Sequence, residues 1–318
     1  MPYKSIASLK KLGNLGAEVV GLAALETGQI AAAVTTDPVK VAIYSYSGGS
    51  PKITNVSLDE AGGVALINKQ VAVVKSGDAI WALLDIQHKA KMEQIGRDIR
   101  SLHACPDGET ALAIGWDGNG AALVFQNNEV GGRQFVLRGD VRAASLRDRM
   151  TYVVVDGSGG GQLRAHPGTT PESGANARVD LPPTAAAHDR LAGGHELSAL
   201  ARRGSDEVCV VLREGASALT VKTLRIGAGV ISVEVLGSSL FALGADGRLR
   251  LFDGDTLRAA TDGGTPSATF ELGLGAQGEP SAMIATVKGG ARLWIGTRGG
   301  DVLRCDPVKG TGLDLAQM

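Results

Sequence analysis

Residues 98–125 read DIRSLHACPDGETALAIGWDGNGAALVF and contain three short apolar runs separated by two turn sequences. The first turn holds Pro-Asp-Gly at 106–108, and the second holds the Gly- and Asp-rich residues 115–120. Short runs of Val, Ile, Leu and Ala bounded by Gly, Asp, Asn and Pro are typical of β-strands joined by tight turns. This stretch therefore predicts three consecutive strands rather than a helix.

The same order of strand, turn and strand recurs along the whole chain. Units open near residues 19, 62, 98, 140, 195, 230 and 281, and seven units in 318 residues average about 45 residues each. That period is typical of the four-stranded blade of a β-propeller. The closest internal match pairs GRDIRSL with RGDVRAA, so that Asp98 and Asp140 are one repeat apart. We predict an all-β chain in which residues 1–318 form a single propeller domain of seven four-stranded blades.

Two parts of this ring have more than one interpretation. The fifth unit is irregular, because residues 216–227 must supply both its third and its fourth strand. Ring closure needs a strand from a terminus. Lys4–Leu12 is one donor for the outer strand of the last blade, and residues 312–318 are the competing donor. The only helical candidates are Thr184–Ala192 and Gln87–Gln94, and both are short.

Three stretches resemble known propeller families. Residues 98–125 resemble a WD-repeat blade, and GADGRLRLFDGDTL (244–257) is similar to the second hairpin of such a blade, with Phe252 and Asp253 where Trp-Asp usually stands. ARLWIGTRGGDVLRCDPVKG (291–310) resembles a blade of the regulator-type propellers appended to sensor kinases. The resemblance covers nearly the whole chain and implies the propeller fold.

Composition narrows the classes of partner. The net charge is −1, and Lys and Arg are scattered singly, so no basic groove for nucleic acid is expected. We also expect no membrane insertion, because no apolar stretch approaches the ~18 to 20 residues that span a bilayer. Cys105, Cys209 and Cys305 are odd in number and embedded in apolar runs. These features predict reduced core thiols in a cytoplasmic protein.

The motifs that suggest chemistry are incomplete. The acids at Asp253 and Asp255 lack the alternate ligands and terminal Glu of a calcium loop, so we interpret them as turn residues. The glycines of 156–162 precede a short strand rather than the helix that a phosphate-binding loop requires. HELSA at His195 lacks the second His of a zinc-protease helix. We therefore expect no metal, no cofactor and no catalytic residue.

One face of the predicted ring concentrates candidate binding residues. In a propeller, the turns between the second and third strands share a face with the connections between blades. We call this the loop face. The residues predicted on it are Asp37, Asp78, Trp116, Asp117, Asp156, Arg213, Glu214, Asp246 and Arg298 from the turns, with Arg97, Asp98, Arg138 and Asp140 from the connections. Exposed Trp and Arg are over-represented at interface hot spots, so Trp116 is the leading protein-binding candidate.

The functional hypothesis is a non-catalytic interaction scaffold, a subunit of a larger cytosolic assembly that binds proteins through the loop face. The long connection Leu181–Gly194 is a second candidate for docking. The alternative is a channel-centred enzyme or small-ligand binder, such as a calcium-dependent lactonase or hydrolase. A deep polar pocket on the ring axis is the feature that separates the alternatives.

Overall fold

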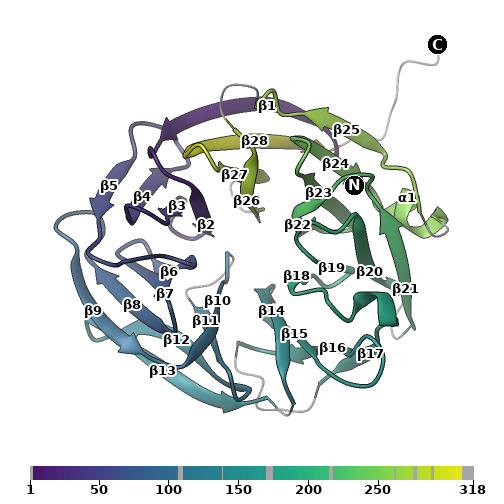
Figure 1. The fold of residues 1–318 in the computed structure, drawn as a ribbon, viewed down its shortest axis with the longest axis horizontal. Coiled ribbons are helices and arrows are strands. Elements are labelled where there is room, and N and C mark those ends of the chain that lie inside the picture. Colours follow the sequence, from purple (N-terminus) through teal and green to yellow (C-terminus); the bar gives the residue numbers. More distant parts are fainter. Residues whose placement is uncertain are drawn as a thin grey trace.

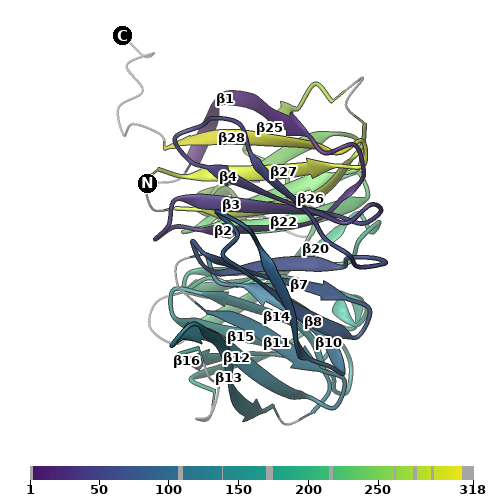
Figure 2. The same ribbon diagram turned by 90° about the vertical axis from the view of Figure 1, so that its left-hand side faces the viewer.

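The computed structural model describes residues 3–106, 110–137, 139–169, 175–214, 218–260, 263–274, 278–287 and 290–309. These residues form seven four-stranded antiparallel sheets arranged as blades around an axis (Figure 1). The predicted all-β propeller of seven blades is therefore confirmed. The strands cross the thickness of the ring, so their turns lie on its two faces (Figure 2).

In the first four blades, the strands follow one another from the axis to the rim. Blade one comprises β2 (Val19–Leu25), β3 (Ile30–Thr35), β4 (Lys40–Ser45) and β5 (Lys52–Asn55). Blade two comprises β6 (Gly63–Asn68), β7 (Val71–Ser76), β8 (Ala79–Leu84) and β9 (Lys91–Gly96). Blade three comprises β10 (Ile99–Ala104), β11 (Ala111–Gly115), β12 (Asn119–Gln126) and β13 (Glu129–Val136). Blade four comprises β14 (Val141–Arg147), β15 (Met150–Val155), β16 (Gln162–Pro167) and β17 (Ala177–Asp180).

The last three blades complete the ring. Blade five comprises β18 (Arg190–Ala192), β19 (Leu197–Ala201), β20 (Glu207–Glu214) and β21 (Ala218–Arg225). Blade six comprises β22 (Val230–Leu236), β23 (Ser239–Gly244), β24 (Arg248–Phe252) and β25 (Ala268–Glu271). Blade seven comprises β26 (Pro280–Thr286), β27 (Arg292–Thr297), β28 (Asp301–Lys309) and β1 (Tyr3–Asn14).

The ring is closed by the N-terminal strand. β1 pairs antiparallel with β28 from Tyr3 opposite Lys309 to Asn14 opposite Asp301, and both views show the two strands side by side (Figures 1 and 2). The donor predicted at Lys4–Leu12 is thus confirmed, and the competing residues 312–318 lie outside the described residues. Because one blade contains both ends of the chain, separating the first and last blades would require the pairing of β1 with β28 to break.

The fifth blade corrects the predicted strand assignment. Its inner strand is β18, so the run at His195 is the second strand and 207–214 is the third. The blade is regular, and residues 218–225 supply only the outer strand. The prediction was wrong because the inner strand has just three residues and follows a Pro- and Ala-rich segment that carries no strand signal.

The helical predictions were also wrong. Within Thr184–Ala192, only a single 3-10 turn, η1 (Pro183–Ala185), precedes β18, while the second half of Gln87–Gln94 belongs to β9. The described chain instead has an α-helix, α1 (Gly254–Ala259), where the sequence indicated a turn. Asp253 caps this helix by accepting a hydrogen bond from the Thr256 amide at 2.8 Å. A helix of six residues is too short to show apolar periodicity.

The apolar core is divided among the junctions between blades. Alternate residues of each strand face the neighbouring sheet, and small Val, Ala, Leu and Ile side chains fill most of these layers. In β24, Leu249 and Leu251 are buried as the alternation predicts, although Arg250 on the opposite face is also buried. All three cysteines are buried, in blades three, five and seven.

One glycine shows how closely a connection packs on a turn. A Cβ on Gly160, in the turn between β15 and β16, would lie 1.9 Å from the Pro182 carbonyl oxygen. We expect Gly160→Ala to lower the free energy of unfolding by about 1 to 3 kcal/mol, because the backbone must move. Gly157→Ala in the same turn is the control, since its nearest atom is 3.9 Å away. Equal urea midpoints for both variants would contradict this packing.

Candidate functional site: the loop face and the central chamber

The predicted loop face exists, and backbone hydrogen bonds show it directly. In blade after blade, an amide of the turn between the second and third strands donates to a carbonyl of the connection that enters the blade. These bonds join Thr36 to Glu18, Asp156 to Asp140, Ala245 to Gly229 and Arg298 to Glu279. The turns are residues 36–39, 77–78, 116–118, 156–161, 202–206, 245–247 and 298–300. They hold the connections in place around the axis.

Most of the predicted residues lie on this face. Those placed there are Asp37, Asp78, Arg97, Asp98, Trp116, Asp117, Asp140, Asp156, Asp246 and Arg298, all of them exposed. Arg213 was wrongly placed, because it ends the third strand of blade five and its amide donates to Glu196 beside the opposite-face turn. Glu214, the last residue of the same strand, was wrongly placed as well. Both placements were wrong because β18 was not predicted, which shifted the strand order of blade five by one. Arg138 lies outside the described residues.

Several of these charged residues hold the turns together. Asp156 accepts from Arg142 at 2.7 Å, and Asp246 makes two contacts with the buried Arg250 at 2.7 and 3.0 Å. Hydrogen bonding from Arg250 is the main cause that lowers the pKa of Asp246. Asp117 accepts from the Asn119 amide at 3.0 Å within its own turn. Hydrogen bonds within the propeller therefore account for the positions of Asp117, Asp156 and Asp246.

Trp116 differs from these residues because its ring is largely unburied. The side chain is 63% exposed at the start of the turn between β11 and β12. The Arg100 guanidinium lies 5.5 Å from the centroid of the indole ring, close enough for a cation–π contact. Arg100 is itself held by a 2.9 Å hydrogen bond to the Val141 carbonyl of the next blade. The indole is thus supported from below and free to contact another molecule on its outer surface.

A groove of about 270 Å³ lies between blades two and three and is lined by Gly115 and Asp117, the sequence neighbours of Trp116, but not by Trp116 itself. Its charged lining includes Arg97, Asp98 and Asp117, three of the predicted residues. Ile80 and Ile95 form one apolar wall. Small residues from blades two and three line much of the groove, namely Gly96, Ala113, Gly115, Gly120, Ala121 and Gly132. This arrangement suits an apolar side chain flanked by polar atoms.

Val136 was missed by the sequence analysis. It ends β13, is 69% exposed and pairs in register with Asn119, two residues beyond Asp117. An exposed Val at the end of an outer strand carries no sequence signal of its own. The glycines at 131–132 are the signal that indicates the groove, since they remove side chains from an outer strand.

The internal repeat has a structural basis in the inner strands. β10 and β14 each begin with a register shift, and Arg100 and Arg142 occupy the extra position. Such bulges re-aim side chains. Arg100 reaches the Val141 carbonyl of blade four, and Arg142 donates to the Gly160 carbonyl at 2.8 Å and to the Ala186 carbonyl of the connection to blade five. The connection Leu181–Gly194 is therefore anchored to the ring rather than a free arm.

A chamber of about 460 Å³ lies on the axis and is lined by all seven inner strands. Its acidic lining consists of Asp189 and Glu234. Its basic lining consists of Lys75, Arg100, Arg142, Arg147, Arg190 and Arg203. A calcium ion requires six to eight oxygen ligands, usually with several carboxylates. The excess of cations therefore does not suit the calcium-dependent enzyme considered as an alternative.

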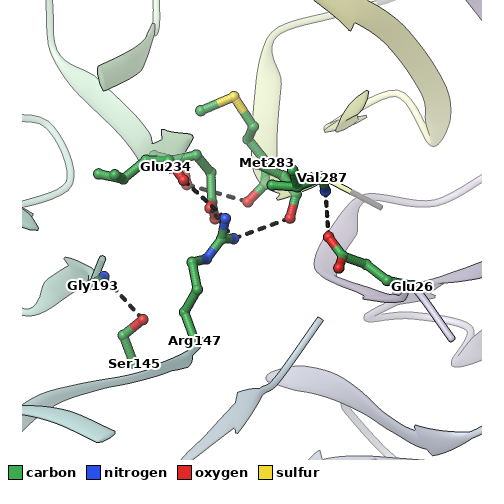
Figure 3. A network of polar contacts seen from close by, with 10 residues as sticks. Glu26, Ser145, Arg147, Gly193, Glu234, Met283 and Val287 are labelled. Atoms are coloured by element: carbon green, nitrogen blue, oxygen red, sulfur yellow. Dashed lines mark hydrogen bonds and ion pairs between the residues drawn. The ribbon is translucent and has the colours of Figure 1, made fainter. Parts of the chain in front are cut away.

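At the face opposite the loop face, Arg147 crosses between blades. Its guanidinium lies 3.2 Å from a Glu234 carboxylate oxygen and donates to the carbonyls of Val235 at 2.9 Å and Ala285 at 3.1 Å (Figure 3). Nearby, the Val287 amide donates to Glu26 (Figure 3). Blades four, six and seven are thus tied together across the axis. Burial raises the pKa of Glu234 to about 7, although Arg147 opposes the shift.

No family model and no curated protein matches this chain. Among the residues that the structure describes, no three His, Cys, Asp or Glu side chains are placed to hold a metal ion. Within the same ranges, no helix has the length and apolar character needed to cross a membrane. The chain is a seven-bladed β-propeller, and its two notable sites are the Trp116 groove and the axial chamber.

Proposed function

We propose that this propeller is a non-catalytic interaction scaffold that binds a partner protein through the loop face of blade three. The observation that carries the proposal is Trp116, which is 63% exposed yet in contact with Arg100, and whose neighbours Gly115 and Asp117 line an open groove. Large aromatic anchors next to a recess are the residues that dominate binding energy in protein interfaces. A rigid ring also presents its turns with little conformational cost of binding.

The groove also indicates what the partner offers. A volume of about 270 Å³ with an isoleucine wall accommodates one or two apolar side chains. The charged side chains that line the groove are those of Asp98, Asp117 and Arg97. We propose an extended partner segment that inserts an apolar residue beside Trp116 and places a basic residue near the two aspartates. Such a segment forms a small, reversible contact unless further turns of the loop face join it.

The proposal also includes the type of propeller, its cellular compartment and its membership of an assembly. The order of strands and turns in blades three and six supports a WD-repeat-like propeller, and many propellers of that kind are assembly subunits. The three cysteines lie buried in different blades, which suits a reducing cytosolic compartment of a bacterial-type cell. Membership of an assembly is therefore part of the proposal, with the partner defined by the segment described above.

Substitution of Trp116 tests this function. We expect Trp116→Ala to weaken capture of the partner at least about thirtyfold, since a hot-spot residue contributes roughly 2 kcal/mol or more. The measurement is quantitative affinity capture with wild-type and variant baits, followed by titration of the recovered partner. Ile53→Ala is the matched control, because Ile53 is also an exposed hydrophobic, 47% accessible, but lies on the outer strand β5.

The outcome has three informative forms. Loss of one partner with Trp116→Ala and not with Ile53→Ala supports the proposal. Equal capture by all three baits refutes the role of Trp116. Loss with both substitutions indicates a general effect on surface hydrophobicity and also refutes it. Unchanged thermal unfolding of Trp116→Ala is expected, because the indole packs against little besides Arg100.

A further inference from the structure

The axial chamber shares Arg100 with the proposed docking site, but the rest of its lining has no role in docking and is chemically distinctive. Polar groups make up the larger share of its exposed wall, and Leu22, Leu102, Val233 and Met283 are among the apolar side chains between them. Its arginines lie at different positions along the ring axis. Because each inner strand enters from the loop face, Arg100, Arg142 and Arg190 lie near that end and Arg147 lies near the other.

The cations at the two ends differ in how far they are neutralised. At the lower end, Arg147 pairs with Glu234. At the upper end, Arg142 pairs closely with Asp156 at 2.7 Å, whereas Arg190 only approaches its neighbour Asp189 at 4.0 Å. Arg203 lies 3.8 Å from Glu18, across the ring in the connection that enters blade one. The upper chamber therefore contains guanidinium groups whose hydrogen-bonding capacity is only partly used.

A second observation indicates positive potential in this part of the chamber. His103 lies on β10 with its Nε2 atom 2.8 Å from the Ser101 hydroxyl. Burial, with a smaller contribution from the positive charge of Arg190, lowers the pKa of His103 to about 4. The imidazole is therefore neutral at pH 7. Burial disfavours a charge of either sign, so only the contribution of Arg190 indicates positive potential at His103, and that potential favours an anion.

We propose that the upper chamber is a binding site for a small organic oxyanion, a carboxylate or phosphate ester, held by Arg190 and Arg100. The planar guanidinium forms paired hydrogen bonds with either oxyanion, and Ser101 and His103 add neutral polar contacts. The apolar side chains of the wall accommodate the carbon skeleton of such a molecule. A volume of about 460 Å³ lies in the range of small-molecule sites.

Isothermal titration calorimetry with defined probes tests this site in the full chain. The probes are inorganic phosphate and succinate, added at constant ionic strength balanced with sodium chloride. We expect one saturable site for at least one probe, and the probe that binds distinguishes phosphate from carboxylate as the preferred group. Arg190→Gln should weaken that binding about tenfold or more, because a charge-assisted hydrogen bond is lost.

Two further variants keep the test decisive. Lys75→Gln removes a second chamber cation and should weaken binding severalfold, whereas Arg225→Gln removes an exposed arginine on β21 and should leave it unchanged. Arg190→Gln should also leave capture of the docking partner unchanged, because Arg190 does not line the groove between blades two and three, so failure of the docking proposal and failure of this one are distinguishable. Absence of heat with both probes, or equal affinity in wild type and Arg190→Gln, would overturn the site. Equal weakening by Arg225→Gln would show that only overall charge matters.

Discussion

Replacing Trp294 by alanine is expected to lower the free energy of unfolding by about 3 to 5 kcal/mol, as for other large buried aromatic residues. Trp294 lies on β27 with its side chain fully buried, in the cluster that joins blade seven to blade one. Its indole ring is 5.3 Å from the ring centroid of Tyr46 and 6.5 Å from that of Tyr44. The substitution leaves a cavity at the junction where the two ends of the ring meet.

Urea unfolding followed by circular dichroism measures this effect. Trp81→Ala is the matched control, because Trp81 lies on β8 and is only partly buried, so its loss should cost less. Trp294→Phe should recover part of the stability by keeping a ring against the tyrosines. If Trp294→Ala unfolds at the same urea concentration as Trp81→Ala, the closing junction is not packed as described.

Replacing Arg147 by methionine should have the second largest effect, and that effect should depend on pH. At pH 8 we expect a loss of about 3 kcal/mol, the lower end of the range for removing one partner of a buried pair, because both side chains face the chamber. At pH 5 the loss should be smaller. Glu234 is then protonated and needs no cation, so only the hydrogen bonds to Val235 and Ala285 disappear.

The direction in which stability changes with pH follows from the pKa of Glu234. Burial raises it from 4.5 to about 7 in the folded protein, so folding favours the protonated carboxyl. The stability contributed by this group is fully present below about pH 4.5 and is lost as the pH rises through 7, by at most about 3 kcal/mol. Glu234→Gln should remove this dependence, because the amide does not titrate. A wild-type stability that does not change between pH 5 and pH 8 would contradict the burial of this carboxylate.

The fold could be predicted from the sequence where strands are long and turns are marked. Alternation of apolar residues and Gly or Asp turns indicated six of the seven blades, and the spacing of Arg100 and Arg142 marked equivalent positions. The strand order of blade five could not be predicted, because β18 has only three residues and pairs through backbone groups that any sequence supplies. The helix α1 was not predicted, because Asp253, the residue that caps it, is equally typical of a turn.

The candidate site was predictable only in part, for a physical reason. Turn positions follow from strand order, so Trp116, Asp98 and Asp117 could be assigned to one face of the ring. Whether a side chain there is free or engaged depends on partners distant in sequence. Asp156 is occupied by Arg142, and the groove depends on the junction between two blades. The chamber combines seven strands, and a net charge of −1 conceals its cations.

The central claim is that blade three docks a partner through the loop face, and hydrogen exchange of the complex tests it most directly. The propeller is measured alone and with its captured partner bound, and the amides that slow are located. We predict protection at residues 96–99 and 115–120, around the Trp116 groove, with no change in the opposite-face turns at 26–29 and 148–149. Protection confined to the opposite-face turns, with the groove amides exchanging as in the free protein, would contradict the claim.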